Sequence, residues 1–280
     1  MSQANRSGPN GVNVTTPNVA RMYDFYLGGK DNYAADREAA RKVLGVAPEV
    51  PLAALENREF VKRAIRFLVH EAGIAQFIDV GPGLPTRSNV HEVVRQHSPE
   101  AHIVYVDNDP VVINHSQTLL GNTPNVAIID EDLREPEHIL GNPRLRELID
   151  FAQPVALCIT LVLHFIPDSG DPYGIAARFR EALSAGSYVV ISHVTGDGRD
   201  AEALAEITDT YDQATASLIM RSRADIVRFF DGFELVEPGV VFLSQWRSTG
   251  EFYSEGGTRW AYAGVGRKPG IPVWLHPDHQ

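Results

Sequence analysis

The sequence of 280 residues is poor in cysteine and has no long apolar run. Its one cysteine, Cys158, rules out a disulfide within the chain and a cysteine-rich zinc site. It stands in the apolar stretch "PVALCITLVLHFIP", which favours a buried small side chain over a reactive thiol. The first residues lack the apolar segment of a secretory signal, and no stretch is long enough to span a membrane. The sequence therefore predicts a cytoplasmic protein with no membrane partner.

Positive charge is scarce as well. Lysine and arginine number 25 against 36 acidic residues, which gives a formal net charge of −11. No basic run is long enough to follow a phosphate backbone. The ten histidines are scattered without the spacing of a metal site. We expect neither a nucleic-acid partner nor a bound metal, and the sequence leaves the oligomeric state open.

Helical patterns come first along the chain. Residues 1–16 are rich in Ser, Asn and Gly and are expected to be poorly ordered. After them, apolar residues recur at helical spacing, with Asn18 as the N-cap of the first helix. Residues 17–73 are therefore expected to form a helical N-terminal extension. Its predicted helices span Val19 to Leu27, the region from near Tyr33 to Gly45, and residues 55–73.

Strand and helix patterns alternate from residue 74 onward. This rhythm predicts a mostly parallel sheet with helices on both faces. Near the end two strands follow each other without a helix, which predicts an antiparallel edge. We expect one domain over residues 17–280. The predicted strands are 76–81, 102–109, 126–136, 154–167, 187–197, 233–246 and 259–268, and the later helices include 200–220 and 223–232.

A glycine turn, "DVGPG", joins the first predicted strand to a helix. It contains Asp79, Gly81 and Gly83. In open α/β sheets, ligands bind beyond the carboxyl ends of the strands, and glycine lets a ligand approach the backbone closely. A turn that only reverses the chain is the alternative interpretation.

Three classes of cofactor compete for such a turn. A nucleoside-triphosphate loop needs a Gly-Lys-Ser/Thr ending, which this sequence lacks. A dinucleotide fingerprint needs a third glycine where Thr86 stands, and Pro82 and Pro85 remove N–H donors for a pyrophosphate. S-adenosylmethionine has no phosphate and suits an acidic turn with glycines. It is the favoured ligand.

Acidic residues also follow the next two strands. Asp107 ends "IVYVDND", 28 residues after Asp79, where a carboxylate can accept both ribose hydroxyls. Asp132 in "DEDLRE" is placed to accept from the adenine amino group, and Leu133 to pack on the ring. Each acid alone is more typical of a solvated loop, but their joint position favours an adenosine site.

The motifs "DVGPG", "YVDND", "DEDL" and "CITLVLHF" together resemble class I S-adenosylmethionine-dependent methyltransferases. More narrowly, "NVARMYDFYLGGKDNYAADREAARKV" with "DVGPGLPTRSNVHEV" resembles the actinobacterial S-adenosyl methyltransferase family, formerly catalogued as a domain of unknown function. The resemblance runs from about Pro17 nearly to the end. It implies a Rossmann-like, seven-stranded methyltransferase sheet.

The resemblance also implies roles for individual residues. The usual third small residue of the glycine motif is replaced by Leu84 and Pro85, which leaves the path of this loop open. The segment from Thr160 to His164 would face the methyl group. The implied cofactor contacts are Asp79, Gly81, Pro82 and Gly83 at methionine, Asp107 and Asn108 at ribose, Asp132 and Leu133 at adenine, and Thr160 near the methyl group.

A histidine is the candidate catalytic residue. His164 follows the fourth predicted strand, where it could take a proton from a hydroxyl or amine acceptor. His193 is a second choice, and a structural role is the alternative for both.

The aromatic residues of the first helix form another candidate group. Tyr23, Tyr26 and Tyr33 could form a lid on the cofactor, although core packing is the alternative. Lys30 and Arg21 could meet its carboxylate tail. The acceptor pocket is expected from residues 201–230 and from Trp246 with Arg247.

The sequence thus predicts a methyltransferase that acts on a small-molecule acceptor by O-, N- or carboxyl-methylation. A non-catalytic module that binds S-adenosylmethionine is the first alternative. A dinucleotide-dependent oxidoreductase is the second.

Overall fold

A computed structural model describes residues 12–85, 89–248, 250 and 257–270. Of the segment expected to be poorly ordered, residues 1–11 lie outside this description. Residues 12–16 lie inside it and contact the first helix, because Arg21 Nη2 donates to the carbonyls of Asn13 and Thr16 at 3.1 and 3.2 Å.

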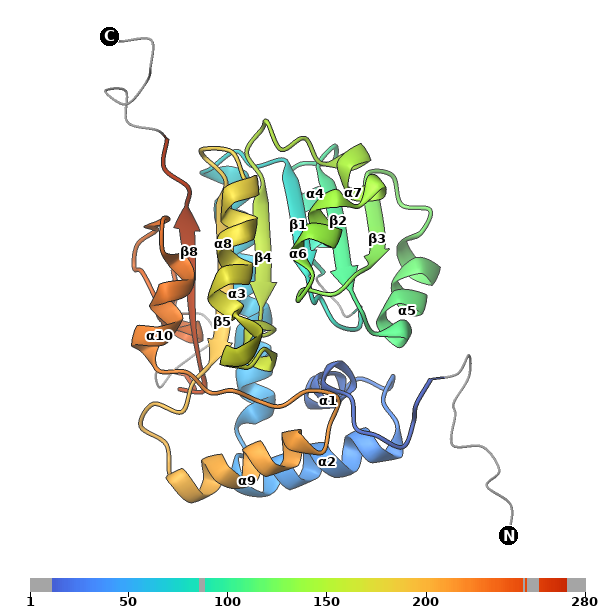
Figure 1. The fold of residues 1–280 in the computed structure, drawn as a ribbon, viewed down its shortest axis with the longest axis vertical. Helices are drawn as coiled ribbons and strands as arrows, with labels where there is room; N and C mark the ends of the chain where they lie inside the picture. The colour runs from blue at the N-terminus through green and yellow to red at the C-terminus, as the bar shows by residue number, and fades with distance from the viewer. Residues whose placement is uncertain (1–11, 86–88, 249, 251–256, 271–280) are drawn as a thin grey trace.

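A central sheet carries the fold (Figure 1). Its order is β3-β2-β1-β4-β5-β8-β6, and β7 also pairs with β8. The first five strands are parallel, whereas β8 runs antiparallel to β5, β6 and β7. The strands are β1 (Gln76–Val80), β2 (His102–Asp107), β3 (Val126–Asp130), β4 (Ala156–Thr160), β5 (Tyr188–Val194), β6 (Glu234–Leu235), β7 (Val241–Phe242) and β8 (Ala261–Arg267). The predicted parallel sheet with an antiparallel edge is confirmed.

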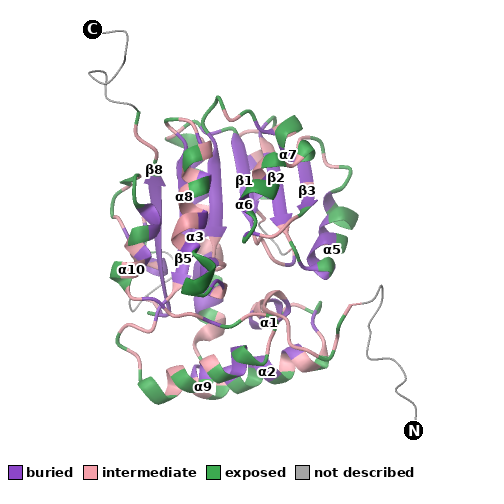
Figure 2. Cartoon of the chain, viewed as in Figure 1, coloured by how far each residue is buried: buried purple, intermediate pink, exposed green. Residues whose placement is uncertain are grey.

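Helices cover both faces of the sheet, so its central strands are buried (Figure 2). Alternate strand residues enter two separate cores. Phe77 and Cys158 pack with α3 and α4, whereas Ile78 and Leu157 pack with α6, α7 and α8. The α-helices are α1 (Val19–Tyr26), α2 (Ala34–Val46), α3 (Val50–His70), α4 (Val90–Arg95), α5 (Pro110–Leu120), α6 (Pro136–Gly141), α7 (Pro143–Leu148), α8 (Pro172–Ala182), α9 (Ala201–Asp212) and α10 (Arg223–Val227).

Several predicted boundaries differ from the structure, and the third and fourth strands, for example, end at Asp130 and Thr160 rather than at residues 136 and 167. The sixth predicted strand is two short strands, β6 and β7, because Pro238 and the positive φ of Gly239 turn the chain between them. Over the residues that the structure describes, the sheet therefore has eight strands rather than the expected seven. Helix α9 ends at Asp212 rather than near residue 220, and α3 begins at Val50, with a proline in its first turn, rather than at residue 55.

Helices α1, α2 and α9 form a layer across the carboxyl ends of the parallel strands (Figure 1). Helix α2 packs against α9 although the two lie far apart in the sequence. The Thr215 N–H, just after α9, donates to the Pro17 carbonyl at 2.9 Å. This layer joins the N-terminal extension to the segment that follows β5.

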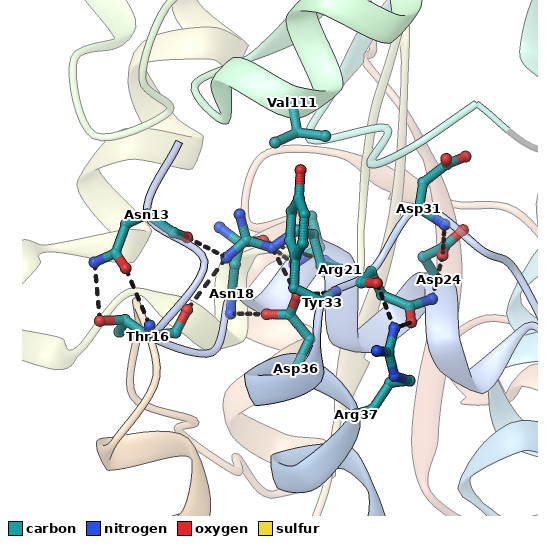
Figure 3. Close-up of polar contacts among 12 residues, drawn as sticks. Asn13, Thr16, Asn18, Arg21, Asp24, Asp31, Tyr33, Asp36, Arg37 and Val111 are labelled. Atoms are coloured by element: carbon teal, nitrogen blue, oxygen red, sulfur yellow. Dashed lines mark hydrogen bonds and ion pairs between the residues drawn. The ribbon is translucent and has the colours of Figure 1, made fainter. Parts of the chain in front are cut away.

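A buried ion pair fixes α1 against α2 (Figure 3). Arg21 Nε donates to Asp36 Oδ2 at 2.9 Å, and both side chains are buried. Asp36 also accepts from the Asn18 and Tyr33 N–H groups at 2.8 and 2.7 Å. Because a buried carboxylate needs such partners, the entry to both helices is set by one side chain.

None of the helices in the described part of the chain is both long and apolar enough to cross a bilayer.

Candidate active site

A cavity of about 490 Å³ lies where the parallel strands end. Its floor comes from the segments that follow β1, β2, β3 and β4, and its roof from α1, α3, α9 and the chain after α9. The strand order reverses between β1 and β4, which is where open α/β sheets bind ligands. The cavity therefore lies at the position that the glycine turn predicted.

The glycine turn needs its glycines for two reasons. Gly81 and Gly83 have φ of 69° and 67°, a region that residues with a Cβ avoid. A Cβ on Gly81 would also lie 2.4 Å from Val162 Cγ2 on the loop after β4. Gly81, Pro82 and Gly83 all line the cavity, so a ligand there meets bare backbone.

Asp107 ends β2 and faces this turn. Its Oδ1 accepts from the Asp109 N–H at 2.9 Å, and its Oδ2 from the Gly83 N–H at 3.3 Å. Burial raises the pKa of Asp107 to about 6, against the effect of these two hydrogen bonds. Asp107 and its neighbour Asn108 line the cavity, and their contact with the cofactor stays a prediction.

Asp132 lies beyond β3 and already has partners. Arg134 Nε donates to it at 2.9 Å, and Asn108 Nδ2 at 2.8 Å. The hydrogen bonds from Arg134 are the main reason that the pKa of Asp132 falls to about 2. Asp132 and Leu133 line the cavity. This carboxylate is ionised at neutral pH.

Asp79 is not placed as expected, because its side chain does not line the cavity. It lies one residue before the end of β1 and pairs in register with Tyr105 and Cys158 on the face covered by α3 and α4. Burial raises the pKa of Asp79 to about 7, while the charge of Arg58 opposes the shift. Burial also raises the pKa of the Cys158 thiol well above its usual value, in keeping with an inert core residue.

Sequence reasoning missed Arg58, which comes from α3 and lines the cavity. Its Nη2 donates to the Pro82 carbonyl at a long 3.4 Å, and its guanidinium lies 5.4 Å from the Tyr23 ring centre. Its Nε is buried and has no hydrogen-bond partner among the described residues. Such a donor is costly unless a ligand satisfies it. The sequence signal was the polar run Glu56, Asn57 and Arg58, which interrupts the apolar pattern of this helix and whose first two side chains are buried.

The structure does not bring the other predicted cation contacts, Lys30 and Arg21, to the cavity. Lys30 is exposed and does not line the cavity. Arg21 is held by the ion pair with Asp36 (Figure 3). The ring centre of Tyr33 lies 5.3 Å from the guanidinium of Arg21. Tyr23 and Tyr26 do line the cavity. The Tyr23 hydroxyl donates to the Ala54 carbonyl at 3.1 Å.

His164 lies beside the cavity together with Thr160. Its Nδ1 accepts from the Val194 N–H at 3.5 Å, which leaves the proton of the neutral ring on Nε2. Burial, with the nearby His193 and Arg221, lowers the pKa of His164 well below its usual value. The imidazole is therefore neutral at pH 7 and a weak base.

His193 has a structural environment. Its Nδ1 donates to the Val194 carbonyl at 2.7 Å, and its Nε2 accepts from Arg221 at 3.0 Å. Burial lowers its pKa to about 3. It does not line the cavity, so the second candidate base is not placed at the site.

Only some of the residues predicted to form the acceptor pocket lie at the cavity. Ile207, Tyr211 and Met220 line the cavity. Trp246 is instead fully buried against Phe60, at 5.5 Å between ring centres, and Arg247 pairs with Glu71 on the surface. Among the described residues no group of three or more metal-binding side chains gathers.

Comparison with known proteins defines the family. The family model described as S-adenosyl methyltransferase matches residues 5–269. This chain belongs to the S-adenosyl methyltransferase family. It is an S-adenosylmethionine-dependent methyltransferase, and S-adenosylmethionine is its cofactor. No curated protein matches the chain.

Solved structures agree with this membership. A Thermobifida fusca YX protein with a provisional methyltransferase name is 38% identical and has a TM-score of 0.87, over 93% of this chain and 98% of that one. A DUF574 family protein of Streptomyces avermitilis MA-4680 is 37% identical, with a TM-score of 0.86, over 91% and 99%. The mitomycin 7-O-methyltransferase MmcR shares the fold at 15% identity and a TM-score of 0.50. The match covers 88% of the chain described here and 71% of MmcR.

Proposed function

We propose that this methyltransferase transfers the methyl group to a small-molecule acceptor inside one continuous cavity. The observation that carries the proposal is the cavity lining, which combines Asp107 and Asp132 at the ends of β2 and β3 with Tyr211 of α9 and Trp260 before β8. We call the part beside β1, β2 and β3 the donor half, and the part beneath α1 and α9 the acceptor half. Because the methyl donor is a metabolite of the cell interior, the proposal places the reaction in the cytoplasm.

The donor half fits the cofactor by its chemistry. Asp107, with Asn108, would accept from the ribose hydroxyls, and Asp132 with Leu133 would hold the adenine. Gly83, where a Cβ would meet no atom within 4 Å, leaves space for the methionine part. Arg58, with its unsatisfied Nε, would hold the carboxylate tail in place of the predicted Lys30.

When bound, the cofactor supplies an electrophilic methyl group on a sulfonium. The chain's own residues orient the acceptor and exclude water, which accounts for most of the catalysis of an in-line displacement. Tyr23 and Tyr26 cover the cavity from α1. His164 contributes a hydrogen bond more readily than it removes a proton, because its pKa is low and its Nδ1 is occupied.

A non-catalytic sensor would need only the donor half. The acceptor half argues for an enzyme, since its lining of Phe165, Leu218 and Met220 continues past the glycine turn.

Calorimetric titration with S-adenosylmethionine, S-adenosylhomocysteine and NAD tests the cofactor site. We expect both adenosyl compounds to bind and NAD to give no heat. Binding of NAD alone would contradict the proposed site. Turnover against a panel of small hydroxyl, amine and carboxylate compounds, followed by S-adenosylhomocysteine release, then separates enzyme from sensor. Tight cofactor binding with no turnover on any compound would favour the sensor.

A further inference from the structure

Aromatic side chains from separate elements line the acceptor half. Tyr26 comes from α1, Tyr211 from α9, Phe165 follows β4 and Trp260 precedes β8. The Phe165 and Tyr211 ring centres lie 6.0 Å apart, with the ring planes inclined by 35°. Aliphatic side chains of Ile207, Leu218 and Met220 fill the spaces between them. Such a lining favours a flat apolar molecule.

Charge is confined to the donor half. Of the described lining residues, the acids Asp107, Asp109, Glu131 and Asp132 all follow β2 or β3. The lining guanidinium groups belong to Arg58, which reaches the glycine turn, and Arg134, which pairs with Asp132.

The cation that contacts Trp260 is neutralised by an acidic partner. Arg199 lies 4.0 Å from its ring centre and pairs with Glu49 at 3.0 Å, and neither residue lines the cavity. An ammonium or carboxylate acceptor would therefore lose its hydration without gaining an ionic partner.

The polar groups of the acceptor half donate hydrogen bonds and do not act as strong bases. The Tyr26 and Tyr211 hydroxyls lie 3.4 Å apart, and burial raises the pKa of both, so both stay protonated. His164 keeps its ring proton on Nε2. An acceptor here must lose its proton without a strong base, which is easier for a phenol, with a pKa of about 10, than for an aliphatic alcohol.

We propose that the acceptor is an uncharged aromatic molecule that is methylated on a phenolic hydroxyl. This inference rests on the proposed function. The phenol oxygen gives an electron pair to the methyl carbon as the carbon–sulfur bond breaks toward sulfur. The products are an aryl methyl ether, S-adenosylhomocysteine and a proton released to solvent.

Three matched probes test the inference: 2-naphthol, 2-naphthoate and 2-(aminomethyl)naphthalene. They share one ring system and differ in the charge of the reacting group. Binding is measured by calorimetry with S-adenosylhomocysteine present, and turnover with S-adenosylmethionine. We expect 2-naphthol to be favoured by about tenfold or more in both measurements. Equal use of the three, preference for a charged probe, or binding of none would overturn the inference.

A variant of Met220 provides the reciprocal test. Met220→Lys puts a cation into the acceptor half and should shift the preference toward 2-naphthoate by about tenfold. Met220→Leu, which stays apolar, should keep the preference for 2-naphthol. If Met220→Lys leaves the preference unchanged, the pocket does not select by charge and the inference fails. Cofactor affinity is measured in each protein, since its loss in the wild type would refute the proposed function itself.

Discussion

The two halves of the cavity are built by opposite means. The donor half consists of strand ends, glycine backbone and carboxylates, and the sheet register fixes their positions. The acceptor half consists of neutral side chains from α1, from α9 and the chain after it, and from the loops after β4 and before β8. In the proposed function the sheet positions most of the cofactor contacts, whereas the added helices supply Arg58 and many of the side chains that would select the acceptor.

The largest effect is expected at Gly81, where the two halves meet. Gly81→Ala should lower the free energy of unfolding by about 2–4 kcal/mol, because the new Cβ meets Val162 and the backbone has a positive φ. Val162 is branched at Cβ and cannot easily turn aside. Urea unfolding measures the loss.

Gly83→Ala is the matched control. Gly83 has nearly the same φ, but its Cβ would meet no atom within 4 Å, so the loss should be only about 1–2 kcal/mol. Adding Val162→Ala to Gly81→Ala should recover part of the stability. Equal losses for the two glycine variants would show that backbone strain alone is responsible.

A variant of Arg58 tests whether the donor half binds the carboxylate tail of the cofactor through a charged hydrogen bond. Arg58→Gln should weaken S-adenosylmethionine binding by about 1.5–3 kcal/mol, because a charged donor to the carboxylate tail is lost. Calorimetry with 5′-methylthioadenosine, which lacks the amino-acid tail, should show no change. The matched variant Lys30→Gln should leave both affinities within about 0.5 kcal/mol of wild type. If Arg58→Gln weakens the binding of both ligands equally, Arg58 does not bind the carboxylate tail.

Asp107 tests the ribose contact. Asp107→Ala should weaken S-adenosylmethionine and 5′-methylthioadenosine alike, by about 1–3 kcal/mol. The control is Asp130→Ala, since Asp130 ends β3 opposite Asp107 in register, is exposed and does not line the cavity.

The same residue predicts a pH dependence. Only the ionised carboxylate accepts both hydroxyls, and the pKa of Asp107 is about 6. Affinity should therefore be constant at high pH and fall as the pH drops through about 6, with a limiting slope of about tenfold per unit. Calorimetry from pH 5 to 8 measures the curve. In Asp107→Ala this fall near pH 6 should disappear, and its persistence would assign the titration to another group.

The smallest effect is expected at His164. His164→Gln should lower kcat by about tenfold or less, because glutamine also donates a hydrogen bond. Removal of a general base would cost about 10²–10⁴-fold and would remove a limb of the pH profile. Turnover of the best acceptor from pH 6 to 9 distinguishes the two roles.

The sheet was predictable because its signals are local. Apolar runs between turn residues marked β1 to β5, and the missing helix before β8 marked the antiparallel edge. The split of the sixth strand was harder, because Val241 and Phe242 resume the same apolar pattern after the turn at Pro238.

The site was predictable where it consists of strand ends. Asp107 and Asp132 lie at the cavity, but Asp79 does not, because it pairs with Tyr105, two residues before Asp107, and so lies within the sheet rather than at its end. Lys30 was favoured by its nearness to the Gly-Gly pair in sequence. Arg58 lines the cavity instead, since the orientation of a helix over a sheet follows from tertiary packing, which local patterns do not encode.

The contact between α1 and the chain after α9 also bears on how the protein is made. The Val19 N–H donates to Thr215 Oγ1 at 3.4 Å, across 196 positions of sequence. Such long-range contacts form late, since the chain between them must first be ordered. During synthesis the roof of the cavity cannot close until residue 215 has left the ribosome. A nascent chain that ends before this point would have the strand ends of the donor half but no closed cavity.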